Sequence, residues 1–281
     1  MLRIRAMNPT DFQPILQLTN HEQWGYTARD LRRILALSPR GCQVAELDGE
    51  RVGLTTTISY GKDLGWIGNV VVRQDHRRSG IGSSLVQSAI RHLVRSQVKS
   101  IGLNCYPENR SMYEQLNFRQ TGGFVTLSLR SHLGPPPRPH LGKIRIKQIL
   151  KLDIESFGAD RSTLLRRLLR EFPRGWTWTT SDSEVLAYSI VKEYQDSSEI
   201  GPSVCREMNQ ANVAELIQSS IALTRKWPLE ISVPDSNKTT LETAARLGFR
   251  LEKAGLTMSH ARLDKVAISP AITALGFLDK G

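Results

Sequence analysis

Residues 69–85 have the sequence Asn-Val-Val-Val-Arg-Gln-Asp-His-Arg-Arg-Ser-Gly-Ile-Gly-Ser-Ser-Leu, in which an apolar run leads through a basic, glycine-containing turn. The run at 70–72 is typical of a buried strand, and apolar positions from Gly82 to Val94 recur at helical spacing. Backbone N–H groups at the start of such a helix bind phosphate oxygens, and glycines let the backbone approach them. We therefore expect an anion-binding turn. Its residues are Arg77, Arg78, Ser79, Gly80, Ile81, Gly82 and Ser83.

Two familiar phosphate-binding patterns do not match this turn. A phosphate-binding loop of the kinase or nucleotidase type needs a Lys-Ser or Lys-Thr pair after its last glycine, and Ser83-Ser84 follow Gly82 instead. A dinucleotide-binding turn needs three glycines and an acidic residue about 20 positions further on. A solvent-exposed loop that only caps the helix remains an alternative for the turn taken alone.

The length of the chain limits the number of domains, and its net charge limits the class of partner. The chain has 281 residues, which suggests about two domains, and a net charge of +11. Residues 1–140 carry 18 Lys and Arg against 10 Asp and Glu, so the excess lies in the first half. This favours an anionic partner, such as nucleic acid, anionic lipid or a phosphorylated small molecule.

The expectations about localisation and metal content rest on features that the sequence lacks. No apolar run approaches the ~20 residues of a membrane span, and the start has no run of signal-peptide length. We therefore expect a cytoplasmic protein with no membrane partner. The three scattered cysteines, Cys42, Cys105 and Cys205, argue against a disulfide framework and a zinc site, and we expect no metal.

The proline-rich segment 133–142 predicts a stiff linker, because consecutive prolines exclude a helix interior and a central strand. We expect one domain at 1–132 and a second at 143–281. The first is mixed α/β in its patterning. Its expected strands are 43–47, 51–59, 66–73, 101–105 and 123–129, and its expected helices include 82–94 and 110–116.

A weak repeat links the two halves. Pro107-Glu108-Asn109 precedes Phe118-Arg119 in the first half, and Pro234-Asp235-Ser236-Asn237 precedes Gly248-Phe249-Arg250 in the second. The order of the motifs is kept, which indicates a diverged internal duplication. Two unrelated strand–helix–strand units are the alternative.

The turn Arg77-x-x-Gly80-x-Gly82, placed after an apolar strand and before an amphipathic helix, resembles the acetyl-CoA loop of the GNAT superfamily of N-acetyltransferases. Downstream, Tyr113-Glu114-Gln115-Leu116-Asn117-Phe118 resembles the second signature of that superfamily, which ends Tyr-x-x-Leu-Gly-Phe. The resemblance covers about residues 2–130. Asn117 replaces the usual glycine, but Asn tolerates the left-handed conformation, so we expect the turn to persist.

The whole chain also resembles a two-domain subgroup, in which a smaller C-terminal domain of related fold follows the acetyltransferase domain. The resemblance implies tandem GNAT domains with mixed sheets, the second degenerate. No Arg-x-x-Gly-x-Gly turn precedes Asn237, and Leu241 or Ala244 replaces Tyr113. The second domain would line the acceptor pocket or hold a homodimer. The matching stretches are 66–72, 153–162, 200–202 and 247–249.

The resemblance implies acetyl-CoA as co-substrate and direct attack of a primary amine on its thioester. The pantetheine arm would lie along the backbone of Val70, Val71 and Val72. Tyr113 matches the position of the general acid. Asn109 would bind the arm or only start the helix as a cap.

The general base remains open, because Gly68 and Asn69 stand where many members of the family carry a Glu. A water chain is one candidate for that role. The side chains considered for it are His21, Glu22, Asp75 and His76.

The acceptor is expected to be a small-molecule amine, because a second domain tends to enclose the site. Protein or peptide amines and a non-catalytic acyl-CoA sensor are alternatives. A nucleic-acid partner is disfavoured, because the basic residues are not interleaved with aromatic ones. Residues in segments where the family places acceptor contacts are Trp24, Tyr26, Trp66 and Asn69, with core packing as the alternative for the aromatic ones.

Overall fold

The computed structural model describes residues 1–131, 145–181, 184–261, 263–264 and 268–276. By its internal contacts the described chain forms two compact units. Unit 1 holds residues 1–121 and 257–264, and unit 2 holds residues 122–256 and 268–276. The segment 133–142, expected to be a linker, lies outside the described residues.

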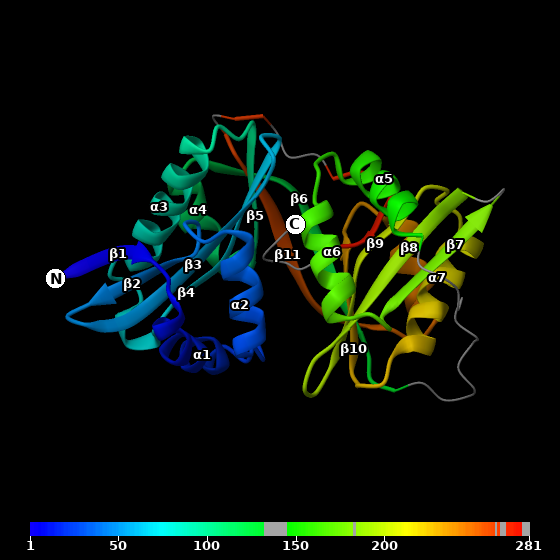
Figure 1. Ribbon diagram of the computed structural model, residues 1–281, viewed down its shortest axis with the longest axis horizontal. Coiled ribbons are helices and arrows are strands. Elements are labelled where there is room, and N and C mark those ends of the chain that lie inside the picture. Colours follow the sequence, from blue (N-terminus) through cyan, green and yellow to red (C-terminus); the bar gives the residue numbers. More distant parts are fainter. Residues whose placement is uncertain (132–144, 182–183, 262, 265–267, 277–281) are drawn as a thin grey trace. The chain divides into compact units, whose positions relative to one another are not determined.

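Unit 1 is a mixed sheet with helices on both faces (Figure 1). Neighbours from β1 to β4 pair antiparallel, and β4 and β5 pair parallel. The strands in spatial order are β1 (Leu2–Ala6), β2 (Gln43–Leu47), β3 (Glu50–Tyr60), β4 (Leu64–Val72), β5 (Ser100–Cys105) and the end of β11 (Arg250–His260). The helices are α1 (Phe12–His21), α2 (Ala28–Leu37), α3 (Ile81–Arg95) and α4 (Arg110–Gln115), with short 3-10 turns η1 (Pro9–Asp11), η2 (Gln74–His76) and η3 (Pro107–Asn109).

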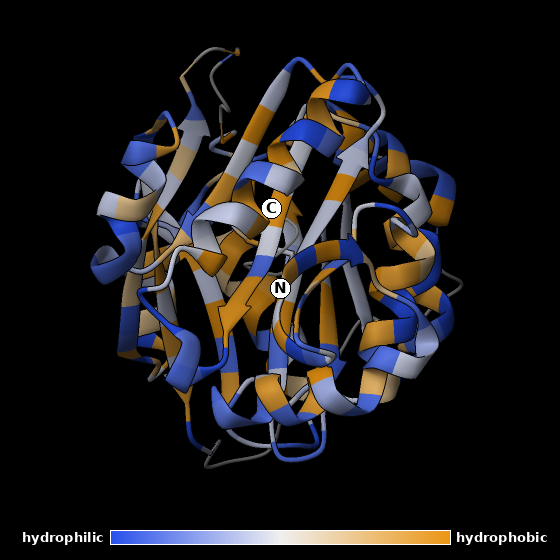
Figure 2. Cartoon of the chain, turned by 90° about the vertical axis from the view of Figure 1, so that its left-hand side faces the viewer, coloured by the Kyte–Doolittle hydropathy of each residue, from blue (hydrophilic) through white to orange (hydrophobic). Residues whose placement is uncertain are grey.

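Two apolar layers hold this sheet, because successive strand residues point to opposite faces. Val44 packs with α1 and α2, whereas its neighbour Ala45 packs with α3. In Figure 2 the strands are coloured largely orange and white, and the helices alternate orange with blue. The α1–α2 layer contains Ile15, Leu18, Leu31, Ile34, Leu54 and Val71, and the α3 layer contains Val52, Ile81 and Leu85.

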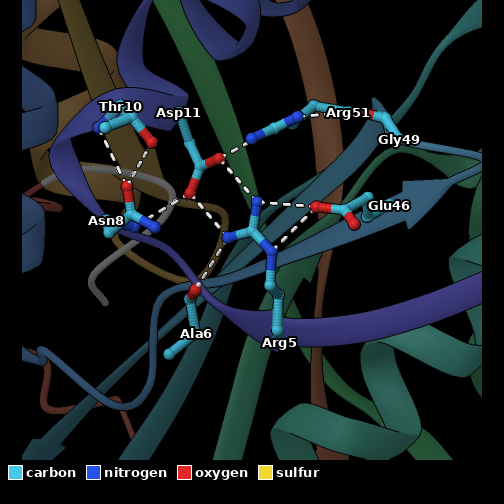
Figure 3. A network of polar contacts seen from close by, with 8 residues as sticks. All are labelled: Arg5, Ala6, Asn8, Thr10, Asp11, Glu46, Gly49 and Arg51. Atoms are coloured by element: carbon cyan, nitrogen blue, oxygen red, sulfur yellow. Dashed lines mark hydrogen bonds and ion pairs between the residues drawn. The ribbon is translucent and has the colours of Figure 1, made fainter.

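A buried carboxylate ties the first strand of unit 1 to the start of α1 (Figure 3). Asp11 has no exposed surface, and its oxygens accept hydrogen bonds from Arg5 at 2.8 Å and from Arg51 at 2.9 Å. The backbone N–H of Asn8 adds a further bond at 2.9 Å. Burial alone would raise the pKa of Asp11, but these bonds hold it well below its usual range.

Among the helices that the structure describes, none is long and apolar enough to cross a membrane.

Unit 2 also consists of a sheet with helices. Its strands in spatial order are β6 (Phe118–Leu129), β10 (Leu229–Pro234), β9 (Ser198–Cys205), β8 (Glu184–Glu193) and β7 (Trp176–Ser181), and β12 (Ile272–Ala274) pairs with β9. Its helices are α5 (Ile146–Phe157), α6 (Ser162–Glu171), α7 (Gln210–Leu223) and α8 (Lys238–Arg246).

Two strands belong to both units. β6 begins in unit 1 and passes into unit 2 at residue 122, and β11 begins in unit 2 and passes into unit 1 at residue 257. The division into domains at 1–132 and 143–281, with a linker between them, stays a prediction.

Candidate active site

β4 and β5 pair over four residues only, from Leu64 with Ser100 to Ile67 with Leu103. Both strands continue beyond this point, but their ladder does not. Within the described residues, the other neighbour of β4 is β3. The β4–β5 ladder therefore does not extend to Val70 and Val71, and a ligand can lie beside their backbone as an added strand. We call this position the β4–β5 divergence.

A β-bulge marks the start of the divergence. Thr56 of β3 pairs with Gly68 of β4, but Leu54 pairs with Val71, so two residues of β4 lie opposite one of β3. The first of these two, Asn69, has a left-handed backbone with φ +51°. Bulges of this kind redirect the backbone groups that follow.

The turn after β4 has the predicted strand–turn–helix arrangement. Gly80 immediately precedes α3 with φ +82°, and a Cβ there would meet open space, so backbone conformation is what favours glycine. Ser84 is the first residue whose N–H bonds back to Gly80, at 3.0 Å. The N–H groups of residues 81–83 consequently have no helical partner and are available to an anion.

The two arginines of the turn differ. Arg77 donates from Nε to the carbonyl of Val72 at 3.0 Å and forms an ion pair with Glu22, so it is held rather than mobile. The side chain of Arg78 is exposed, and its backbone is left-handed with φ +61°. Ser79 donates to the carbonyl of His76 at 2.5 Å. Of the residues expected at the turn, Arg78 therefore has the charge most available to a phosphate.

The candidates for a general base are engaged in ion pairs or lie at the surface. Glu22 pairs with Arg77, and Asp75 accepts from Arg73 at 2.8 Å. His76 lies 2.6 Å from the same guanidinium, and His21 is exposed at the end of α1. None of these contacts assigns a base.

Tyr113 lies on α4 with 6% of its surface exposed, and its ring packs edge-on against Phe118 at 6.0 Å. Within the described residues its hydroxyl forms no hydrogen bond. Burial, followed by the nearby Cys105, raises the pKa of Tyr113 far above its usual range. The hydroxyl is therefore protonated at physiological pH, as an ordinary tyrosine also is, and burial makes it a weaker acid than an exposed tyrosine.

An asparagine lies just outside each end of α4, and both belong to the second signature expected from the sequence. Asn117 has φ +65°, which confirms that asparagine supports the left-handed turn expected there. Asn109 precedes the helix, but its exposed side chain forms no capping hydrogen bond. The amide of Asn109 is therefore available for another partner.

The residues expected to contact the acceptor have unequal exposure. Tyr26 donates from its hydroxyl to Asn69 Oδ1 at 2.6 Å, and Trp24 lies beside Tyr26 with ring centroids 5.7 Å apart. Trp66 is 2% exposed, so it packs in the core and has little surface for a ligand. The sequence did not indicate Thr56, which accepts from Asn69 Nδ2 at 2.9 Å.

In unit 2 the stretch 153–162 forms a buried network. Arg161 donates to Asp153 at 2.8–3.1 Å, and the hydroxyl of Tyr188 donates to the same carboxylate. Asp160 accepts from the backbone N–H of Ser162 at 2.8 Å and so begins α6. Asp160 thus satisfies a backbone N–H at the start of α6, whereas Asp153 and Arg161 stabilise the core.

Comparisons with known proteins agree with this geometry. Residues 9–118 match a model of the acetyltransferase (GNAT) family, and residues 149–266 match a model of an acetyltransferase (GNAT) domain. The chain is 20% identical over 245 residues to the uncharacterized N-acetyltransferase YitH of Bacillus subtilis (strain 168), covering 84% of this chain and 83% of the relative.

Solved structures share the fold. A proposed acetyltransferase of Pyrococcus horikoshii has a TM-score of 0.81 at 21% identity, covering 100% of this chain and 96% of the other. A tandem GNAT protein from the clavulanic acid biosynthesis pathway has a TM-score of 0.68 at 14% identity, covering 92% and 98%. With family models matched in both halves, the chain belongs to the GNAT acetyltransferases and carries two domains of that family in tandem.

Proposed function

We propose that unit 1 transfers the acetyl group of acetyl-CoA to a primary amine, most simply that of a small molecule. The observation that carries this proposal is the β4–β5 divergence, which leads directly into the turn at the start of α3. The amides of a pantetheine arm can pair with a free strand edge, and a pyrophosphate can accept from N–H groups at a helix start. The two features lie in the order that one CoA molecule requires.

Each group then has a role in binding. The backbone of Val70–Val72 would hold the pantetheine arm. The N–H groups of residues 81–83, with Gly80 and Arg78, would hold the pyrophosphate. Asn109 would bond the arm with its free side-chain amide.

In the proposed reaction the neutral amine attacks the thioester carbonyl carbon, a C–N bond forms, and the carbonyl electron pair moves to oxygen. A backbone N–H of Val70 or Val71 would stabilise that oxyanion. The intermediate collapses, C=O re-forms and the C–S bond breaks. Tyr113 would protonate the departing thiolate, and the proton lost by nitrogen passes to water, since β4 carries no carboxylate.

Binding of acetyl-CoA can be tested at the turn. Gly82→Glu places a carboxylate where the phosphate oxygens would lie, so we expect calorimetric affinity to fall at least about 100-fold, roughly 3 kcal/mol. Gly82→Ala is the matched control, because it adds a Cβ at the same position, 3.4 Å from the nearest side-chain atom, without the carboxylate, and should bind acetyl-CoA nearly as wild type does. Equal affinity of both variants would remove the turn from the binding site.

The acid role of Tyr113 predicts a second result. Tyr113→Phe keeps the buried ring but removes the proton donor, so turnover across an amine panel should fall by about 10- to 100-fold, with acetyl-CoA affinity within about twofold. Tyr60→Phe, at a buried tyrosine in the distant end of β3, should leave turnover unchanged. Unchanged turnover of the Tyr113 variant would assign the ring a packing role only.

A non-catalytic acyl-CoA sensor is the second candidate. The absence of a carboxylate from β4 favours it, because the ammonium of an acceptor must lose a proton before attack. Tight acetyl-CoA binding without transfer to any amine of a broad panel would support the sensor over the enzyme.

A further inference from the structure

Asn69 occupies the bulge of β4 with its side chain almost fully buried, at 7% exposure. Its left-handed backbone is one that side-chain-bearing residues seldom adopt. Asparagine adopts this conformation more readily than other side-chain-bearing residues, and contacts from its surroundings restrict it further.

The side-chain amide of Asn69 supplies such a restraint from two directions. Its oxygen accepts from the hydroxyl of Tyr26 at 2.6 Å, and its nitrogen donates to the hydroxyl of Thr56 at 2.9 Å. Tyr26 comes from the segment between α1 and α2, and Thr56 from β3. The amide plane is thereby fixed between two elements, and the backbone to which it is attached is fixed with it.

A second tie reaches the other end of the same stretch. Glu22, four residues before Tyr26, forms an ion pair with Arg77, which in turn donates to the carbonyl of Val72 at 3.0 Å. The segment 22–26 thus contacts β4 at the bulge and, through Arg77, at the end of the strand. The backbone between these points, Val70–Val72, is the part without β5 partners.

We propose that Asn69 and Tyr26 are positioning residues: they hold the bulge so that the N–H of Val70 or Val71 points to the thioester oxygen as it gains charge. The inference rests on the proposed acetyl transfer. Positioning of the bulge replaces contact with the acceptor as the role of Asn69 and Tyr26, because the side-chain amide of Asn69 already forms hydrogen bonds within the protein. A donor that is fixed in advance stabilises an oxyanion more than one that must reorganise.

Three variants separate conformation from hydrogen bonding. Asn69→Ala removes both bonds and disfavours the left-handed backbone, so kcat should fall about 100-fold, the scale of losing one oxyanion donor. Asn69→Gly removes both bonds but keeps that backbone accessible, so it should recover part of the loss. Tyr26→Phe removes one bond and should lower kcat about 10-fold. The KM for the amine and the Kd for acetyl-CoA should stay within about twofold in all three.

The control is Thr57→Val, which removes the hydroxyl of the buried β3 residue next to Thr56; that hydroxyl donates to the carbonyl of Gly41. All assays are run well below the midpoint of thermal unfolding of each variant. Wild-type kcat in the Asn69 variants would overturn the proposal. A raised amine KM with unchanged kcat would also overturn it, by assigning the pair to acceptor binding.

A readout without turnover keeps the inference distinct from the proposed function. We expect backbone amides of residues 69–72 to exchange hydrogen about 10-fold faster in Asn69→Gly and Tyr26→Phe than in wild type or Thr57→Val. Equal exchange would overturn the positioning role even if no acceptor is found. Absence of transfer by the wild-type protein would contradict the proposed function alone.

Discussion

In each unit a central strand pairs with its parallel neighbour for a few residues and then leaves it. β4 and β5 share four pairs, and β9 and β10 share three, ending at Ile200 with Ile231. β9 carries a bulge at this point as β4 does, because its register with β8 shifts after Ile200. The bulge falls at Gly201-Pro202 in unit 2 and at Asn69 in unit 1.

The two divergences differ in what lies beside them. In unit 2, β12 pairs antiparallel with β9, placing Ile272 opposite Val204, and the N–H of Leu275 donates to the carbonyl of Ser232 on β10 at 2.8 Å. The chain therefore lies between β9 and β10 as an added strand. In unit 1 the described residues include no strand in the corresponding position.

The side chain at the start of the next helix extends the comparison. Asn237 in unit 2 corresponds to Asn109 in unit 1, and its amide donates to the carbonyl of Ile272 at 2.8 Å and that of Pro270 at 3.3 Å. Unit 2 thus binds its own peptide groups where unit 1 is proposed to bind the amides of pantetheine. We expect one acetyl-CoA per chain, measured as calorimetric stoichiometry.

The largest effects should come from the buried carboxylates of the two units. Asp11→Asn and Asp153→Asn each leave arginine charge with a partner missing, so each should lower the free energy of unfolding by about 3–5 kcal/mol. Asp63→Asn, at an exposed pair with Lys99, should cost less than about 1 kcal/mol. Saturating acetyl-CoA should offset the loss in Asp11→Asn more than in Asp153→Asn, since the proposed ligand binds unit 1.

The Asp11 effect has a pH dependence of defined sign. Because its pKa is lowered in the folded protein, the network in Figure 3 contributes fully above the unfolded pKa of about 4 and is lost as pH falls below it. The difference in free energy of unfolding between wild type and Asp11→Asn should therefore shrink progressively as the pH falls from about 5 to about 2. A constant difference over that range would contradict the ionic role of Asp11.

A smaller effect is expected from displacing the added strand of unit 2. A Cβ at Gly201 would lie 2.1 Å from the carbonyl oxygen of Leu275, and its φ of +139° also disfavours a side chain. Gly201→Ala should therefore cost about 2–3 kcal/mol of stability. Its acetyl-CoA affinity should match wild type, because unit 1 is unaltered. A second bound acetyl-CoA in this variant would show that only the added strand closes unit 2 to the ligand.

Local patterns predicted much of unit 1 and little of this difference. The strand, turn and helix of residues 69–85 and the left-handed Asn117 follow from periodicity and glycine chemistry, which act between near neighbours. The bond between Tyr26 and Asn69 joins positions 43 residues apart, and no local pattern records it. The short strand β12 could not be predicted from its own sequence either, because it forms only by pairing with β9 beside β10.

The smallest effects test whether the two asparagines have parallel roles. Asn109→Ala should weaken acetyl-CoA binding about 5-fold, which corresponds to one net hydrogen bond of about 1 kcal/mol, and leave stability unchanged because the side chain caps nothing. Asn237→Ala should do the reverse: it breaks bonds to Ile272 and Pro270, so it should lower stability by at least about 1 kcal/mol and leave acetyl-CoA affinity unchanged. Unchanged affinity in Asn109→Ala would break the correspondence between pantetheine and the added strand, because the amide would then bind only in unit 2.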